Sequence, residues 1–245
     1  MSISSTLSSI SAVEQVKLSA ITVLGRYPSA FPRLAALGSS RETLVTPSSD
    51  FCIEAPPRSG NSFFLVGFNI ANPGLSVAHH HHVPAQALNA IKWGIPLLTI
   101  LRNPIDCALA KTAPTGKKFL IGTTLGRWFS FWRTLEPILP AASPVSFEAL
   151  IADPSSIIAR INATYGTSFS TRFPEAEEVF ASIEASRLAI VGPEGAATPS
   201  PNVPSERTAQ KEAALRPEAE AHSTAGPAVD LYRRLLPVVQ RLETQ

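Results

Sequence analysis

Short apolar runs alternate with helical patterns along most of this chain, and their order predicts the fold class. Four runs have the length and composition of buried strands, at 50–55, 75–78, 95–101 and 145–147. Apolar residues at helical spacing predict helices at 61–71, 85–92, 125–139, 155–165, 175–186 and 229–242, with one more after Pro104. Nearly continuous apolar strands that alternate with helices are typical of a parallel sheet covered on both faces. We therefore expect a three-layer α/β/α fold with a central parallel sheet.

The N-terminal part and one C-terminal stretch differ from this pattern. Residues 12–37 have helical spacing that Pro28 and Pro32 interrupt, so we expect 1–46 to form a helical lead-in and 47–245 the α/β domain. Residues 191–205 are rich in Gly and Pro and have few bulky side chains, which predicts a loop or lid. The start of the chain lacks the basic and apolar regions of a secretory signal, and no window reaches the ~20 apolar residues of a membrane span. We expect a soluble, cytoplasmic protein without a membrane span.

Composition narrows the classes of partner. Hydrophobic residues make up 44% of the chain and charged residues 16%, which is enough apolar material for a packed core. The formal net charge of +2 gives no support for a nucleic-acid partner or a polybasic membrane surface. The two cysteines, Cys52 and Cys107, lie far apart in apolar surroundings, which excludes a disulfide framework and a cysteine-based zinc site.

Two turns that follow predicted strands contain residues suited to binding phosphate or sulfate. Residues 57–63 read Pro-Arg-Ser-Gly-Asn-Ser-Phe and lead directly from a strand into a helix, so backbone N–H groups and the helix dipole point at the same place as Arg58. The Walker pattern is absent, which disfavours an ordinary ATPase or nucleotide kinase. Arg102 follows the strand at 95–101, and ligands of open α/β sheets bind at this carboxyl edge. A plain strand–turn–helix corner is the alternative interpretation of residues 57–63 taken alone.

Four consecutive histidines, His79 to His82, come just before Pro84. Adjacent side chains of an extended segment point to opposite sides, so at most two of these rings could share one metal ion. No carboxylate or Cys follows at ligand spacing, and we therefore expect no metal. A neutral histidine near pH 7 is suited to act as a general base, whereas a purely structural role is the alternative.

Taken in order, these motifs resemble those of the sulfotransferases that use 3′-phosphoadenosine 5′-phosphosulfate (PAPS). Residues 57–63 are similar to the family's 5′-phosphosulfate loop, 82–84 to its His-x-Pro element, 102–106 to the start of its 3′-phosphate motif, and 145–154 to a later strand motif. The resemblance implies a P-loop NTPase-like sulfotransferase fold, PAPS as co-substrate and no metal. It implies that His82 and Arg58 are catalytic. It also implies that PAPS is bound by Arg58, Ser59, Gly60, Asn61, Ser62, Phe63 and Arg102.

The chain departs from the family pattern where the 3′-phosphate should bind. Ala110 stands at the position of a serine in that motif, and the family's C-terminal Arg-Lys-Gly segment is missing. Arg207 and Lys211, which follow the Gly/Pro-rich stretch, are the nearest candidates to replace it. The predicted function is sulfuryl transfer from PAPS to a hydroxyl or amine of a small-molecule or carbohydrate acceptor. A non-catalytic PAP- or nucleotide-binding relative and a phosphotransferase with the same loop are the alternatives.

Overall fold

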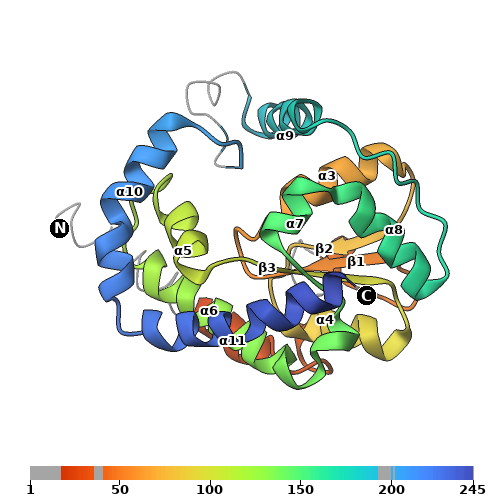
Figure 1. Cartoon of the computed structure of the whole chain (residues 1–245), viewed down its shortest axis with the longest axis horizontal. Helices are drawn as coiled ribbons and strands as arrows, with labels where there is room; N and C mark the ends of the chain where they lie inside the picture. The colour runs from red at the N-terminus through yellow and green to blue at the C-terminus, as the bar shows by residue number, and fades with distance from the viewer. Residues whose placement is uncertain (1–17, 36–40, 193–199, 201, 245) are drawn as a thin grey trace.

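A four-stranded, entirely parallel sheet forms the centre of the molecule (Figure 1). The computed structural model describes residues 18–35, 41–192, 200 and 202–244. The strands are β1 (Phe51–Glu54), β2 (Val77–His79), β3 (Leu97–Leu101) and β4 (Pro144–Ser146), in the order β2-β1-β3-β4. All four predicted strands are present, and each begins and ends within two residues of its predicted bounds.

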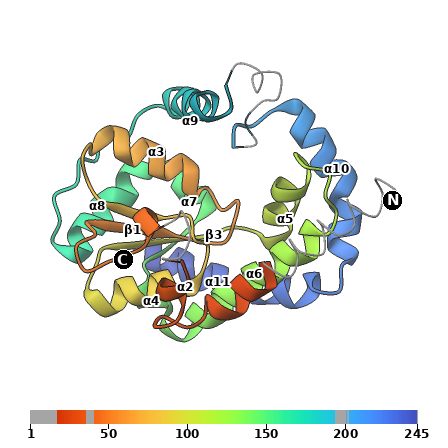
Figure 2. The same cartoon turned by 180° about the vertical axis from the view of Figure 1, so that it is seen from behind.

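Helices cover both faces of the sheet, as Figures 1 and 2 show. One layer contains α3 (Asn61–Ala71), α7 (Phe147–Ala152) and α8 (Pro154–Tyr165), and the other contains α4 (Pro84–Trp93), α6 (Leu120–Leu135) and α11 (Ala225–Glu243). Side chains alternate along a strand, so Ile53 packs in the first layer's core and Cys52 in the second's. The predicted α/β class with three layers is confirmed.

The other elements lie around this centre. They are α2 (Phe31–Ala35), α5 (Pro104–Thr112), α9 (Ala176–Val191), α10 (Glu206–Ala221) and two 3-10 helices, η1 (Arg41–Thr43) and η2 (Glu136–Ala142). The helix predicted at 125–139 begins earlier, at Leu120, and gives way to η2 at Glu136, where Ile138 has non-helical backbone angles. The strand predicted to reach Phe147 ends one residue earlier, because the Ser146 hydroxyl accepts from the Ala149 N–H and caps α7.

The described part of the predicted lead-in contains helical segments joined by turns and packs on the α/β layers. Residues 18–24 are helical, and the Gly25 carbonyl accepts a hydrogen bond from the Ala85 N–H at the start of α4. Arg26 Nε donates to Ser130 Oγ of α6 at 2.8 Å. Residues 1–17, 36–40, 193–199, 201 and 245 lie outside the described residues. The lid predicted at 191–205 therefore falls largely outside them. Among the described helices, none is long and apolar enough to cross a membrane.

The strand order determines where a ligand can reach the sheet. From β1 the chain adds β2 on one side and β3 on the other, so the order reverses between β1 and β3. In open α/β sheets, the crevice at the carboxyl ends of the strands beside such a reversal is the usual ligand site. The β1–α3 loop (residues 55–60) and Arg102, which directly follows β3, both lie at this crevice.

Candidate functional site

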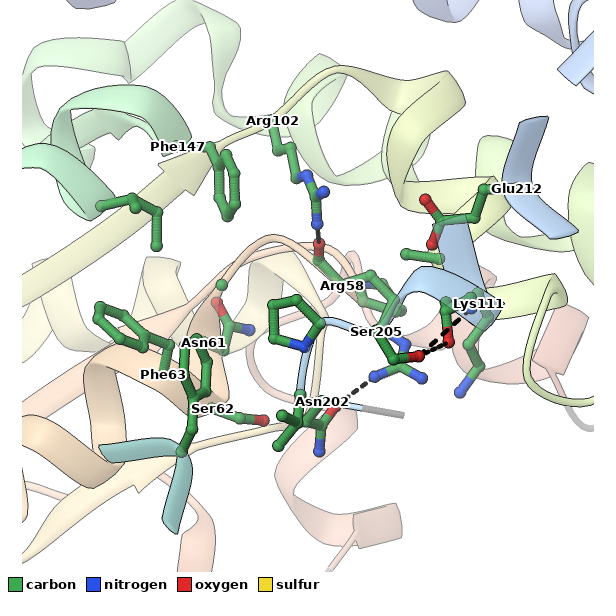
Figure 3. A pocket seen from close by; sticks show the side chains of 18 of the residues that line it. Arg58, Asn61, Ser62, Phe63, Arg102, Lys111, Phe147, Asn202, Ser205 and Glu212 are labelled. Carbon is green, nitrogen blue, oxygen red and sulfur yellow. Dashed lines mark hydrogen bonds between the residues drawn. The ribbon is translucent and has the colours of Figure 1, made fainter. Parts of the chain in front are cut away.

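A pocket of about 580 Å³ opens at the carboxyl ends of β1 and β3 (Figure 3). Its walls come from the β1–α3 loop, the first turn of α3, the histidine segment, α5, α7, α9 and the segment 202–212. Seven of the ten catalytic or PAPS-binding candidates from the sequence line it: Arg58, Gly60, Asn61, Ser62, Phe63, His82 and Arg102. Residues from two separate sequence motifs and the histidine run therefore meet in one place.

The β1–α3 loop has a backbone shape that only certain residues adopt without strain. Arg58 and Gly60 both have positive φ angles, of 69° and 101°. A Cβ atom on Gly60 would lie 3.2 Å from the ring of Phe147, so glycine suits this position both for its backbone angle and for its size. Helix α3 starts at Asn61, directly after this turn, and the N–H groups of its first turn have no partners within the helix. These donors and the positive end of the helix dipole favour an anion.

Arg102 contacts both the β1–α3 loop and the first residue of α7. Its Nη1 donates to the backbone carbonyl of Arg58 at 2.7 Å, and its guanidinium carbon lies 4.1 Å from the centroid of the Phe147 ring. The indole N–H of Trp128 donates to the Arg102 carbonyl at 2.9 Å. Side chain and backbone are thus both fixed by neighbours, and the guanidinium still lines the pocket.

The pocket wall formed by these loops is cationic. Arg58, Arg102 and Lys111 all line it, and burial together with the nearby Arg102 lowers the pKa of Arg58. A lowered pKa means that the protonated guanidinium pays for desolvation and like-charge repulsion, which a bound anion would offset. Glu212 of α10 also faces the pocket, and burial raises its pKa although Arg102 acts in the opposite direction. Asn202 Oδ1 accepts a hydrogen bond from Arg58 Nη1.

The surroundings of His82 favour the tautomer and the charge state that a general base requires. Its Nδ1 lies 2.8 Å from the carbonyl oxygen of Ala55. Asn61 Nδ2 lies 3.2 Å from the same Nδ1 and donates to the Ala55 carbonyl at 3.3 Å. The shorter contact, between Nδ1 and an oxygen that only accepts, favours the tautomer with the hydrogen on Nδ1 and the lone pair on Nε2. Burial and then the charge of Arg127 hold the pKa of His82 well below its usual 6.5, so the ring is neutral at pH 7.

The other three histidines have separate partners. His80 Nε2 lies 3.2 Å from Ser62 Oγ and lines the pocket, whereas His81 Nε2 lies 3.0 Å from Thr43 Oγ1. His79 Nδ1 lies 2.6 Å from His80 Nδ1, and burial, followed by the charges of His80 and His81, lowers the pKa of His79 to about 4. Within the part of the chain that is described, no three His, Cys, Asp or Glu side chains are grouped to hold a metal ion.

Three predicted ligand residues do not line the pocket. Ser59 is fully buried, and its hydroxyl lies 3.6 Å from the thiol of Cys107. Arg207 and Lys211 are exposed on α10, whose lining residues are instead Thr208, Ala209 and Glu212. The roles of these three residues stay predictions.

Sequence reasoning missed several residues of the site. Lys111 lies next to Ala110 in the last turn of α5 and lines the pocket with it. Its spacing was the available signal. Lys111 follows Cys107 by one helical turn, so the two residues share a face of the helix that begins just after Arg102. Phe147, which we assigned to a strand, presents its ring to Arg102. Glu212 lies on α10, a helix that the sequence did not predict.

No family model, no curated protein and no solved structure matches this chain. The chemistry assigned to the pocket therefore depends on the sequence motifs and on the geometry described above.

Proposed function

We propose that the protein transfers a sulfuryl group from PAPS to a hydroxyl or amine of a small acceptor. The observation that carries this proposal is the meeting of the β1–α3 loop, Arg102 and a neutral His82 around one pocket at the β1/β3 crevice. Their order along the chain is the order of the sulfotransferase motifs that they resemble. The P-loop NTPase-like sulfotransferase fold is part of the same proposal, and the parallel three-layer architecture is compatible with it.

The reaction divides among residues of the chain as follows. The acceptor oxygen or nitrogen forms a bond to sulfur while the bond from sulfur to the 5′-phosphate oxygen breaks, and 3′-phosphoadenosine 5′-phosphate (PAP) leaves. His82 Nε2 takes the proton of the acceptor, since this nitrogen has the lone pair. Charge builds up on the equatorial and leaving oxygens, as in phosphoryl transfer. Arg58 and the N–H groups at the start of α3 are the donors that stabilise it.

The 3′-phosphate is assigned to the cationic wall formed by Arg102 and Lys111. Arg102 offers a planar pair of donors, which suits a phosphate group. Ala110 has no hydroxyl to contribute, but its neighbour Lys111 lines the same pocket. A lysine can therefore supply the attraction that a serine supplies in the family motif.

Ligand-dependent unfolding tests the proposal. A ligand that binds only the folded state at 100 times its Kd raises the free energy of unfolding by about 2.7 kcal/mol. We expect PAP to raise Tm, and ADP or ATP to raise it much less. Stabilisation by ADP or ATP but not by PAP would favour a phosphotransferase instead. Turnover of labelled PAPS with panels of sugars, phenols and lipids then separates an enzyme from a binding protein, because a non-catalytic relative binds PAP but transfers nothing.

A further inference from the structure

The backbone of His81 and His82 is hydrogen-bonded from two sides by the ionisable side chains of Glu54 and Arg127. The N–H groups of His81 and His82 donate to the two carboxyl oxygens of Glu54, at 2.9 and 2.7 Å. Arg127 Nη2 donates to the carbonyl oxygens of the same two residues, at 3.3 and 3.4 Å. We call this arrangement the backbone clamp. Every hydrogen-bonding backbone group of the two histidines is thus paired with Glu54 or Arg127.

The clamp is built into the core of the fold. Glu54 is the last residue of β1 and is fully buried, and Arg127 lies on α6, in the layer toward which the Glu54 side chain points. Burial raises the pKa of Glu54 to about 8 and lowers the pKa of Arg127 to about 10. Both shifts show that the buried site penalises the two charges, and a buried polar group is tolerated only when it is hydrogen-bonded.

The clamp acts on a strained residue. His82 has a φ of 57°, in the left-handed region, which costs a residue other than glycine about 1–2 kcal/mol. Such a conformation persists only where its surroundings impose it. The same conformation directs Nδ1 toward the Ala55 carbonyl and the Asn61 amide, and the ring lines the pocket.

We infer that Glu54 and Arg127 are positioning residues for His82, which fix the tautomer and direction of its imidazole through the backbone clamp. They act on the base and not on the phosphate contacts, since neither of them lines the pocket. The catalytic part of this inference rests on the proposed function, but the structural part, the tautomer of His82, does not.

Glu54→Gln tests the clamp with little change in volume. The new NH₂ group faces a backbone N–H where an oxygen accepted before, so one of the two hydrogen bonds is lost. Because a misplacement of about 1 Å can cost about 10²-fold in rate, we expect kcat to fall about 10- to 100-fold, with the KM for PAPS changed less than about twofold. The matched control is Thr99→Val. Thr99 is the register partner of Glu54 on β3 and is equally buried, and its hydroxyl bonds the Ala142 carbonyl, away from His82.

Two variants of Arg127 test the clamp independently. They also replace Glu54→Gln as the test if that variant does not fold. Arg127→Met removes the donors to both carbonyls, whereas Arg127→Lys keeps one cationic donor near them. The clamp predicts that kcat is lower in Arg127→Met and partly restored in Arg127→Lys. Equal kcat in the two variants, or a loss in Thr99→Val as large as in Glu54→Gln, would overturn the positioning role.

The tautomer is measured by ¹⁵N NMR of the histidine side chains, which needs no substrate. In the native protein, the His82 resonances, identified by their loss in His82→Asn, should report Nδ1 protonated and Nε2 unprotonated. In Glu54→Gln and Arg127→Met, we expect this signature to give way to exchange between tautomers. If it persists unchanged in both, the clamp is refuted even where PAPS is turned over. If it is lost while no PAPS is turned over by the native protein, the clamp stands and the proposed function fails.

Discussion

The guanidinium of Arg102 and the backbone carbonyl of Arg58 are joined by a hydrogen bond of 2.7 Å, which connects the end of β3 to the loop after β1. The two residues belong to separate motifs, 44 positions apart in the chain. Since the Arg58 carbonyl turns inward to this bond, the loop has a fixed shape before any ligand arrives. Preorganised donors of this kind are what charge stabilisation in catalysis requires.

Arg58 should stabilise charge in the transition state. We expect Arg58→Ala to lower kcat by about 10²–10³-fold, the usual loss for one such donor. Initial rates with labelled PAPS measure the effect, and Asn202→Ala is the comparison, because Asn202 is the partner of the Arg58 guanidinium. An unchanged kcat in Arg58→Ala would remove this residue from the catalytic group.

His82 should act as a base that stays neutral well below pH 7. His82→Ala is expected to lower turnover about 10²–10⁴-fold and to leave PAP affinity nearly intact. Because burial lowers the pKa of His82 below 6.5, protonation switches the base off only in more acidic solution. In the native protein, protonation of His82 should therefore lower kcat only when the pH is well below 6.5.

His81→Ala is the control for that variant, since the His81 ring bonds Thr43 and does not line the pocket. A larger loss of turnover in His81→Ala than in His82→Ala would show that the base has been assigned to the wrong histidine.

Lys111 should bind phosphate more than Lys211 does. Lys111 lines the pocket beside Ala110, whereas Lys211 is exposed on α10 outside the lining. A hydrogen bond to a charged group contributes about 1.5–3 kcal/mol, so Lys111→Ala should weaken PAP about tenfold or more. Lys211→Ala should have little effect. The reverse order in a calorimetric titration would favour Lys211 as the replacement for the missing C-terminal segment.

Gly60→Ala should impair the site as well as the fold. The left-handed conformation costs an alanine about 1–2 kcal/mol, and its Cβ would lie 3.2 Å from the Phe147 ring that packs on Arg102. Gly94→Ala is matched for the backbone, with a φ of 68° at the end of α4, but its Cβ would meet nothing within 4 Å. We expect similar losses of Tm in both variants, and weaker PAP binding only in Gly60→Ala. Equal PAP affinity in the two would contradict a close fit around Gly60.

Strands β1, β3 and β4 could be predicted because each is buried on both faces of the sheet. In β2 only Ala78 is buried, and a short apolar run was its signal. Helix α10 could not be predicted, because its apolar signal is weak: Ala219 is its only buried residue in the described structure, and Pro217 lies inside it. Ion pairs from Arg216 to Asp106 of α5 and from Lys118 to Glu218 bind this helix to its neighbours. Contacts of this kind leave no periodic pattern, although Ser205 as N-cap was a readable start signal.

The site could be predicted where its residues follow strands, as Arg58 and Arg102 do. The backbone clamp could not, because Glu54 ends an apolar run and Arg127 lies in an aromatic helix, with no motif joining them. Their relationship exists only through the backbone of His81 and His82. A charged residue at the buried end of a strand was the one signal available for Glu54.

The central claim, that the pocket binds PAPS through a 3′-phosphate contact, is tested most directly by calorimetric titration of PAP, ADP and adenosine 5′-phosphosulfate into the native protein and Arg102→Ala. We predict that the native protein binds PAP more tightly than ADP, and that Arg102→Ala weakens PAP about tenfold or more, as expected for a lost charged hydrogen bond. The affinity for adenosine 5′-phosphosulfate, which has no 3′-phosphate, should fall much less in Arg102→Ala. Equal affinity of the native protein for PAP and ADP, or unchanged PAP binding in Arg102→Ala, would contradict the claim.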